Sequence, residues 1–262
     1  MANPKIITKN ESEEPTRRLA VLIDADNAQA AIIEGLLEEI ASFGEATVKR
    51  IYGDFTSPRS SQWKNFLNKY AIKPVQQFAY ATGKNATDSA LIIDAMDLLY
   101  TRRFDGFCLV SSDSDFTGLA LRIREEGLLV LGFGEKKTPD AFRNACHKFT
   151  LTEVLRPVTQ QKSENINANS AQTTTTTQES SLEESPENFI LNALEKTCND
   201  TGWANLANLG NYLNKLKPDF DARLYGFKSL GAMAKAHPDI FEISLERNNP
   251  NSPAKVLYIR KK

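Results

Sequence analysis

Two stretches of the 262-residue sequence decide the fold: AVLIDADN at Ala20–Asn27 and VSSDSDF at Val110–Phe116. The first contains most of the apolar run Leu19–Ile23, and the second closes the apolar run Phe107–Val110. Nearly continuous apolar runs of this kind are typical of strands that are buried on both faces of a parallel sheet. Both runs end in a pair of aspartates. The sequence therefore predicts two central strands with acidic residues at their carboxyl ends.

Short apolar segments alternate with amphipathic ones over residues 17–156, a pattern that predicts β-α-β units and a mostly parallel sheet. The expected strands are Leu19–Ile23, Thr47–Tyr52, Ile72–Phe78, Phe107–Val110 and Leu128–Phe133. The expected helices lie near Gln29–Ser42, Gln62–Tyr70, Asp88–Thr101 and Asp115–Glu126. With the three most apolar strands placed centrally, the simplest strand order is 3-2-1-4-5. Ligands of such sheets bind at the carboxyl ends of the strands where the order reverses, here the first and the fourth.

Aspartates gather at this predicted crevice. They follow the first strand, follow the fourth strand or head the sheet-facing stripe of the third helix: Asp24, Asp26, Asp113, Asp115 and Asp88. Several carboxylates in one crevice raise one another's pKa unless a cation lies between them. Oxygen ligands without His or Cys favour Mg²⁺ or Mn²⁺. Such an ion can activate water for attack on a phosphodiester.

Simpler roles for the same residues stay open. The polar run Ser112–Ser114 can cap the fourth helix, because Ser-x-x-Asp there resembles a capping box. An acidic residue such as Asp88 in a first helical turn also favours the helix dipole. Asn27 either orients a metal-bound water or a phosphate, or only shapes the turn. Asp94 flanks the sheet-facing stripe of the third helix, so its position alone does not decide its role.

The whole chain is close to neutral, with 32 Lys and Arg against 33 Asp and Glu. This sum hides an uneven distribution, because residues 186–262 carry 11 basic and 8 acidic residues, a formal charge of +3. Cys108, Cys146 and Cys198 are widely spaced, so neither a disulfide framework nor a zinc site is expected. A cytoplasmic setting fits this cysteine pattern. The apolar runs are too short for a membrane span, so no membrane partner is expected.

Residues 157–185 differ in composition from the rest. They contain no aromatic residue and no glycine, and they include five consecutive threonines at Thr173–Thr177. Such a segment buries too little apolar area to offset the entropy lost on ordering it. We therefore expect a disordered tail over residues 1–16, a first domain over 17–156, a flexible linker over 157–185 and a second domain over 186–262.

The motifs of the first domain resemble a known family, the NYN domain, a branch of the PIN-like nucleases. The similar stretches are AVLIDADN at Ala20–Asn27, KNATDSALIID at Lys84–Asp94 and VSSDSDF at Val110–Phe116. The resemblance implies a Rossmann-like, three-layer α/β domain that cuts RNA with Mg²⁺ or Mn²⁺ held by acidic residues. By position, the family's site residues fall on Asp24, Asp88, Asp113 and Asp115, accompanied by Asn27. Further candidates at the crevice are Asp26, Asp94 and Ser112.

A second resemblance covers about Ser185–Arg260 and is to the OST-HTH, or LOTUS, domain. Its motifs are WANLANLGNY at Trp203–Tyr212, KPDF at Lys217–Phe220 and LYGFKSL at Leu224–Leu230. That family implies a small winged-helix-like module that binds RNA, although some relatives engage protein partners instead. The apolar pattern predicts a helical core and a terminal hairpin of Phe241–Leu245 and Val256–Arg260.

Basic residues near the crevice and on the second domain are candidates for holding the RNA backbone. They are Lys84, Lys136, Lys137, Lys215, Lys217, Arg223, Lys228 and Lys235. Solvated surface charge is the simpler interpretation of each one taken alone.

The leading hypothesis is a metal-dependent ribonuclease whose second domain delivers RNA on a tether, with endonucleolytic cleavage favoured. A non-catalytic RNA-binding adaptor is the first alternative. The second is a haloacid-dehalogenase-like phosphatase, since those enzymes also carry D-x-D after the first strand. However, Asn27 and Ala28 stand where Gly-Thr is usual in that class. The RNA substrate and its cut sites, endonucleolytic versus exonucleolytic cleavage, the number of metal ions, the oligomeric state and the choice between RNA and protein as the ligand of the second domain stay open.

Overall fold

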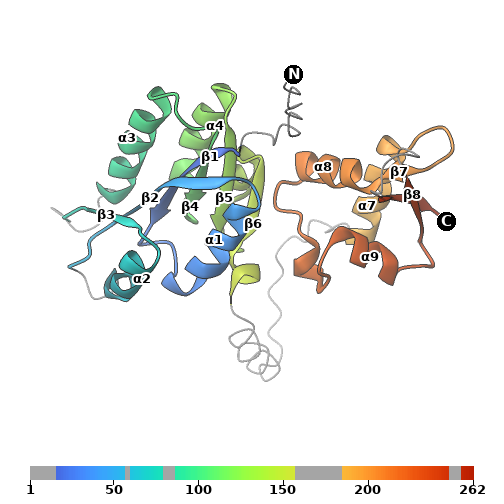
Figure 1. The fold of residues 1–262 in the computed structure, drawn as a ribbon, viewed down its shortest axis with the longest axis horizontal. Helices are drawn as coiled ribbons and strands as arrows, with labels where there is room; N and C mark the ends of the chain where they lie inside the picture. The colour runs from blue at the N-terminus through green and yellow to red at the C-terminus, as the bar shows by residue number, and fades with distance from the viewer. Residues whose placement is uncertain (1–15, 57–59, 79–85, 157–184, 248–254) are drawn as a thin grey trace, which may run out of the picture.

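A six-stranded sheet in the order β3-β2-β1-β4-β5-β6 forms the centre of the first domain, and all its neighbouring strands run parallel (Figure 1). The computed structural model describes residues 16–56, 60–78, 86–156, 185–247 and 255–262. The strands are β1 (Arg18–Asp24), β2 (Glu45–Gly53), β3 (Lys73–Gln76), β4 (Gly106–Val110), β5 (Leu129–Gly134) and β6 (Lys148–Leu151). The predicted α/β class and the order of the first five strands are confirmed.

Helices cover both faces of the sheet (Figure 1). One face carries α1 (Ile33–Ala41) and α2 (Lys64–Lys69), and the other carries α3 (Ala86–Tyr100), α4 (Thr117–Glu125) and α5 (Asp140–Ala145). Short 3₁₀ turns accompany them: η1 (Ala30–Ile32), η2 (Ser60–Trp63), η3 (Ser114–Phe116) and η4 (Thr152–Leu155). The result is a three-layer helix–sheet–helix arrangement.

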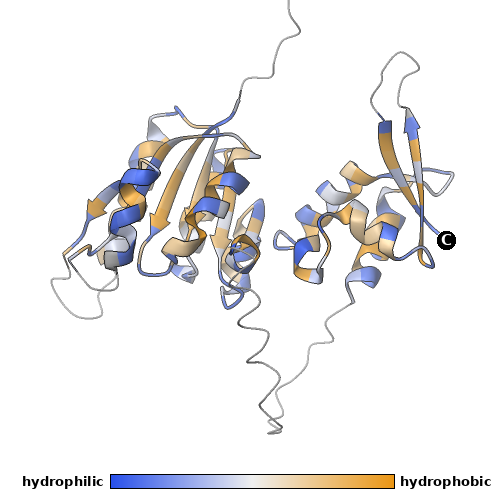
Figure 2. Cartoon of the chain, turned by 60° about the horizontal axis from the view of Figure 1, so that its bottom comes forward, coloured by the Kyte–Doolittle hydropathy of each residue, from blue (hydrophilic) through white to orange (hydrophobic). Residues whose placement is uncertain are grey.

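The two faces of β1 supply two separate cores. Ala20 and Leu22 pack in the cluster beneath α3, whereas Leu19, Val21 and Ile23 pack in the cluster beneath α1. Successive side chains of a strand point to opposite faces, so a strand covered on both sides needs apolar residues at every position. This explains the unbroken apolar run. Figure 2 shows the same division, with hydrophobic strands between helices whose outer faces are more hydrophilic.

The strand β6 is the one element of this sheet that the sequence analysis does not predict. It consists of the four residues KFTL, which are too few to show a periodicity. It pairs with β5 and forms an edge of the sheet. Its buried Phe149 packs edge-on against Phe142 of α5, with ring centroids 5.8 Å apart. Packing rather than sequence pattern therefore fixes this strand.

A small second domain is present, as predicted, and it places helices against a three-stranded antiparallel sheet of order β7-β9-β8. Its elements are α7 (Pro186–Thr197), β7 (Ala204–Asn205), α8 (Leu206–Leu216), η5 (Ala222–Tyr225), α9 (Leu230–Ala236), β8 (Phe241–Arg247) and β9 (Lys255–Lys261). The side chains of Ser185, Asn205 and Ser229 cap its three helices by accepting backbone N–H bonds. Its core includes Leu194, Leu209, Leu213 and Met233 from its helices, in agreement with the predicted helical core.

Some predictions fall on residues outside the described ranges. These are residues 1–15 of the expected tail, residues 157–184 of the expected linker and Lys84 among the candidate RNA contacts. The proposed domain boundaries therefore stay predictions. Among the helices that the structure describes, none combines the length and apolar character needed to cross a membrane.

Candidate metal centre

The carboxyl ends of β1 and β4 lie side by side where the strand order reverses. Their register pairs Ile23 with Val110, so the residues that follow leave the sheet at the same level. Asp24 is the last residue of β1, and Ser111 directly follows β4. The helix α3 contacts η3 at this edge. The topology therefore brings three acidic segments of the sequence together.

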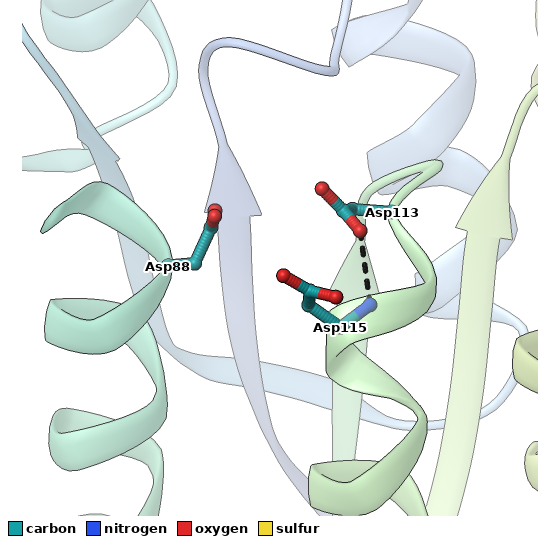
Figure 3. Close-up of side chains that lie close together, drawn as sticks. All are labelled: Asp88, Asp113 and Asp115. Carbon is teal, nitrogen blue, oxygen red and sulfur yellow. Dashed lines mark hydrogen bonds between the residues drawn. The ribbon is translucent and has the colours of Figure 1, made fainter. Parts of the chain in front are cut away.

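Three carboxylates form the centre of the site: Asp88 from the first turn of α3, and Asp113 and Asp115 from the turn after β4. Each offers an oxygen, and these oxygens all lie within 4.8 Å of one another. In Figure 3 the Asp88 side chain points from its helix toward the two aspartates opposite. The predicted convergence of these three residues is therefore present in the structure.

Local hydrogen bonds hold Asp113 in place. It is the N-cap of η3, and its Oδ1 accepts the backbone N–H of Asp115 at 2.9 Å. Its own backbone N–H donates to Ser111 Oγ at 3.1 Å. The cap that Asp113 forms is therefore on η3, whereas α4 itself has Phe116 as its N-cap with no side-chain bond. The cap on η3 does not conflict with membership of the cluster, because it is made through one of the two carboxylate oxygens.

Burial and repulsion both act on Asp88. Burial in the wall of the site is the larger cause, and the neighbouring carboxylates of Asp24, Asp113, Asp115 and Asp26 add to it, so that the pKa of Asp88 rises to about 6. Each of these causes disfavours a negative charge at this position. A divalent cation among the three carboxylates would offset this repulsion and favour a negative charge on Asp88. The electrostatics of the protein alone thus indicate a site suited to a cation.

Asp24 is fully buried and lies beside this cluster instead of within it. Its Oδ2 accepts hydrogen bonds from Ser111 Oγ at 2.7 Å and from Asn27 Nδ2 at 2.8 Å. Its Oδ1 accepts the backbone N–H of Asp26 at 3.0 Å. Burial raises the pKa of Asp24, and these donors oppose that rise. The carboxylate is therefore held in one orientation by residues of both strand ends.

The remaining crevice candidates have identifiable roles in the structure. Asn27 orients the Asp24 carboxylate, so its contact is with an acid and not only with the turn. Asp26 has an exposed side chain. Ser112 is buried, and its Oγ accepts the backbone N–H of Glu135 at 2.9 Å, which joins the turn after β4 to the end of β5. Asn27 and Ser112 thus stabilise the frame around the three carboxylates.

Asp94 is engaged away from the three-carboxylate cluster. One of its carboxylate oxygens accepts a hydrogen bond from Arg50 Nη1 and the other accepts one from the Tyr52 hydroxyl. Burial, followed by the hydrogen bond to Asp94, raises the pKa of Tyr52, so the phenol stays protonated. Because both partners belong to β2, these bonds fasten α3 to the sheet. They thereby help to position Asp88, about one and two-thirds turns earlier on the same helix.

The candidate RNA contacts are spread over the two domains. Lys137 is exposed but forms an ion pair with Glu135 at 2.8 Å. Arg223 is engaged by Glu39 and Asp221. The other described candidates have exposed side chains, namely Lys136, Lys215, Lys217, Lys228 and Lys235. Lys136 and Lys137 follow β5 of the first domain, whereas the other described candidates belong to the second domain.

Sequence analysis overlooks three residues that support the site: Ser111, Arg50 and Tyr52. Ser111 stands between an apolar strand and two aspartates, and that place at the strand end is the signal that could have identified it. Tyr52 ends the second predicted strand and faces Asp24 in the register of β1 and β2. No sequence signal pairs Arg50 with Asp94, because 44 positions separate them.

The families that match this chain agree with the geometry of the site. The model of the NYN domain matches residues 18–153, and that range contains the sheet and every acidic residue of the site. The chain belongs to the NYN domain family. NYN domains are part of the PIN-like nuclease superfamily, which supports a hydrolase that acts on phosphodiester bonds. The OST-HTH/LOTUS domain model matches residues 183–252. Both predicted resemblances are confirmed, and OST-HTH/LOTUS domains support RNA as a partner of this NYN protein.

Two solved structures resemble this NYN chain. One is the solution NMR structure of an uncharacterized protein from Nitrosomonas europaea, with 47% sequence identity, coverage of 36% of this chain and 90% of that chain, and a TM-score of 0.27. The other is the crystal structure of a protein of unknown function from Vibrio parahaemolyticus, with 19% identity, coverage of 53% of this chain and 94% of that chain, and a TM-score of 0.44. Among curated proteins, no match to the chain was found.

Proposed function

We propose that this NYN-family protein is a Mg²⁺- or Mn²⁺-dependent ribonuclease that hydrolyses RNA phosphodiesters at the cluster of Asp88, Asp113 and Asp115. The convergence of these three carboxylates at the reversal of strand order carries the proposal. Open parallel α/β sheets bind their ligands at this place. Membership of the PIN-like nucleases supports the reaction class.

The chemistry of the donor set fits a hard divalent cation. Asp88, Asp113 and Asp115 would hold it, with Asp24 adding negative charge from the buried side of the site. Carboxylate oxygens without thiolate or imidazole suit Mg²⁺ and Mn²⁺ better than softer metals. When bound, such an ion supplies an activated water and neutralises the charge that develops on the phosphoryl oxygens.

The residues of the chain act chiefly by fixing the acids in advance. Ser111 and Asn27 hold Asp24, and the N-cap bond to the Asp115 N–H holds Asp113. Preorganised groups need no rearrangement when charge develops during the reaction. Asp115 is exposed, so the site is open to a substrate as large as a polynucleotide.

The second domain supports RNA as the substrate class. It matches the OST-HTH/LOTUS family, and it carries the exposed lysines Lys215, Lys217, Lys228 and Lys235. Lysines that neutralise phosphates give binding that weakens as salt rises. We propose that these residues hold the RNA backbone. The free cysteines Cys108, Cys146 and Cys198 suit a reducing compartment, and we assign the protein to the cytoplasm on that basis.

One experiment separates this function from the two alternatives. Wild type and Asp113→Asn are incubated with labelled single-stranded RNA and with a phosphomonoester, each with Mn²⁺ or with EDTA. The proposal expects RNA cleavage by the wild type only with Mn²⁺, and a loss of at least about 100-fold in the variant. RNA binding without cleavage would favour a non-catalytic adaptor. Phosphate release without RNA cleavage would favour a phosphatase of the haloacid-dehalogenase type.

A further inference from the structure

The edge strand β6 of the first domain lies against a segment of the second domain, residues 214–223. The segment begins in the last turn of α8, which ends at Leu216, and Figure 1 shows α8 beside β6. The backbone N–H of Phe149 in β6 donates to the carbonyl of Pro218 at 2.9 Å. Beside this bond, Lys148 Nζ donates to Asn214 Oδ1 at 3.3 Å. The segment thus continues the hydrogen bonding of the sheet beyond its last strand.

One ion pair flanks this contact on each face of the sheet. On the α1 face, Arg223 binds Glu39 with both ends of its guanidinium, through Nη1–Oε2 at 2.8 Å and Nη2–Oε1 at 3.0 Å. On the α5 face, Arg143 Nη1 donates to Asp219 Oδ2 at 3.0 Å. Because α1 and α5 cover opposite faces, the segment straddles the edge of the sheet. Two-sided contact of this kind fixes orientation as well as position.

The charged partners are largely shielded from water. The side chains of Glu39, Arg143 and Asp219 are only 16%, 17% and 12% exposed. Ion pairs in such surroundings are screened less than surface pairs and demand good geometry. A bidentate guanidinium–carboxylate pair has that geometry. These pairs therefore differ from the weak, solvated salt bridges of an ordinary protein surface.

Both sides of the contact are preorganised. Asp221, with a side chain only 9% exposed, accepts from Arg223 Nε and Nη2 and so aims the guanidinium at Glu39. Arg143 is held by the carbonyls of Thr138 and Lys136. Groups held in place beforehand lose less entropy when they bind. The charges are also complementary across the boundary between the domains, since each domain contributes one member of each ion pair.

The position of the contact has a physical reason. An edge strand presents unpaired backbone groups, and proteins cover or blunt such edges to prevent association with other chains. Pro218 is buried here and supplies a carbonyl while having no N–H to satisfy. The segment 214–223 is therefore suited to close this edge.

We infer that the edge of β6, with Glu39 and Arg143, is a docking surface for residues 214–223 of the same chain, and that the second domain occupies one fixed position on the NYN domain. RNA held by the second domain would then reach the acidic cluster over a set distance. This differs from delivery on a free tether. It does not depend on the nuclease proposal, since the docking contacts include none of the three cluster aspartates.

The inference can be tested on the full chain by measuring the distance between two spin labels. Cys198 is the exposed member of the three free cysteines and takes one label, whereas Cys108 and Cys146 are buried. Glu125→Cys at the end of α4, where the side chain is 68% exposed, takes the other. We expect one narrow distance distribution. Glu39→Arg should remove at least about half of the narrow population, because it sets a second guanidinium against Arg223.

Two further variants make the result decisive. Lys255→Glu is a charge reversal of equal size and opposite sign at an exposed residue of β9, and it should leave the distribution narrow. Asp219→Ala removes the second pair while Arg143 keeps its bonds to the two carbonyls, so it should broaden the distribution without involving Arg223. A broad distance distribution in the labelled protein without any interface substitution would overturn the inference. So would a narrow distribution that neither Glu39→Arg nor Asp219→Ala changes.

Discussion

Ser111 donates its hydroxyl hydrogen to Asp24 Oδ2 across 2.7 Å, and this bond joins the carboxyl ends of β1 and β4. The same oxygen of Ser111 accepts the backbone N–H of Asp113 at 3.1 Å. One buried hydroxyl therefore links the fully buried acid of the site to the turn that carries two of the clustered carboxylates. The frame of the candidate metal centre depends on this link.

Replacing this hydroxyl should weaken the fold as well as the site. Ser111→Ala leaves the buried Asp24 carboxylate without one donor and the Asp113 N–H without its acceptor. Such losses cost about 1–3 kcal/mol. Urea unfolding at pH 7 measures the change. Ser114→Ala, at an exposed side chain in the same turn, is the control and should change stability by less than about 0.5 kcal/mol. Equal effects of the two substitutions would show that the Ser111 link contributes nothing.

The stability of the metal-free protein should depend on Asp88. Its pKa is about 6 in the folded protein, because of burial and neighbouring carboxylates, against the ordinary 3.8. The folded state then binds more protons than the unfolded state between about pH 4 and pH 6, so the free energy of unfolding falls as pH rises through this interval. Urea midpoints measured in EDTA should show this decrease. In Asp88→Asn the decrease should be smaller, and an unchanged slope would contradict the assignment.

Asp94 should behave as a positioning residue. Its carboxylate faces Arg50 and Tyr52, away from the three-carboxylate cluster. Asp94→Asn should therefore lower stability, by about 1–3 kcal/mol for a bond to a charged group. It should leave Mn²⁺ affinity within about threefold of wild type, as measured by calorimetry. Asp113→Asn serves as the comparison and should lower that affinity at least tenfold. If Asp94→Asn weakened Mn²⁺ binding as much as Asp113→Asn does, Asp94 would belong to the ligand set.

Gly134 should not tolerate a side chain. A Cβ there would lie 2.6 Å from the Ser111 carbonyl oxygen and 2.7 Å from Thr138 Oγ1. Because the first of these atoms is backbone, Gly134→Ala must displace the turn after β4, at a cost of about 1–3 kcal/mol. Thermal unfolding measures this loss. Gly118→Ala in α4 meets no heavy atom within 4 Å and should instead stabilise the protein by about 0.5–1 kcal/mol. Equal effects of the two substitutions would contradict the close approach of Gly134 to the Ser111 carbonyl.

Much of the site could be predicted from the sequence because its residues stand at the ends of recognisable strands. Asp24 and Asp113 follow apolar runs, and the strand order then brings them to one crevice with Asp88. The sequence does not show how deeply each aspartate side chain is buried. Asp24 is buried and hydrogen-bonded beside the cluster, whereas Asp115 is exposed within it. Burial depends on tertiary packing, which no strand-end motif encodes.

The contacts between the domains could not be predicted for a similar reason. Arg223 and Glu39 are separated by 184 positions, and each alone is typical of a charged surface residue. The strand β6, which forms the docking edge, is too short to give a periodic signal. The positive charge of residues 186–262 suggested RNA binding for Arg223. In the structure its guanidinium lies between two carboxylates, so RNA binding by Arg223 stays a prediction.

The central claim is that the clustered carboxylates support metal-dependent cleavage of RNA. The most direct test is the initial rate of single-stranded RNA cleavage with Mn²⁺ at pH 7.5, for wild type, Asp88→Asn and Asp97→Asn. Asp97 is exposed on the same helix and outside the cluster, which makes it a matched control. We predict cleavage by wild type and by Asp97→Asn, abolished by EDTA, and a rate at least about 100-fold lower for Asp88→Asn. Cleavage by Asp88→Asn at the wild-type rate, or cleavage that persists in EDTA, would contradict the account.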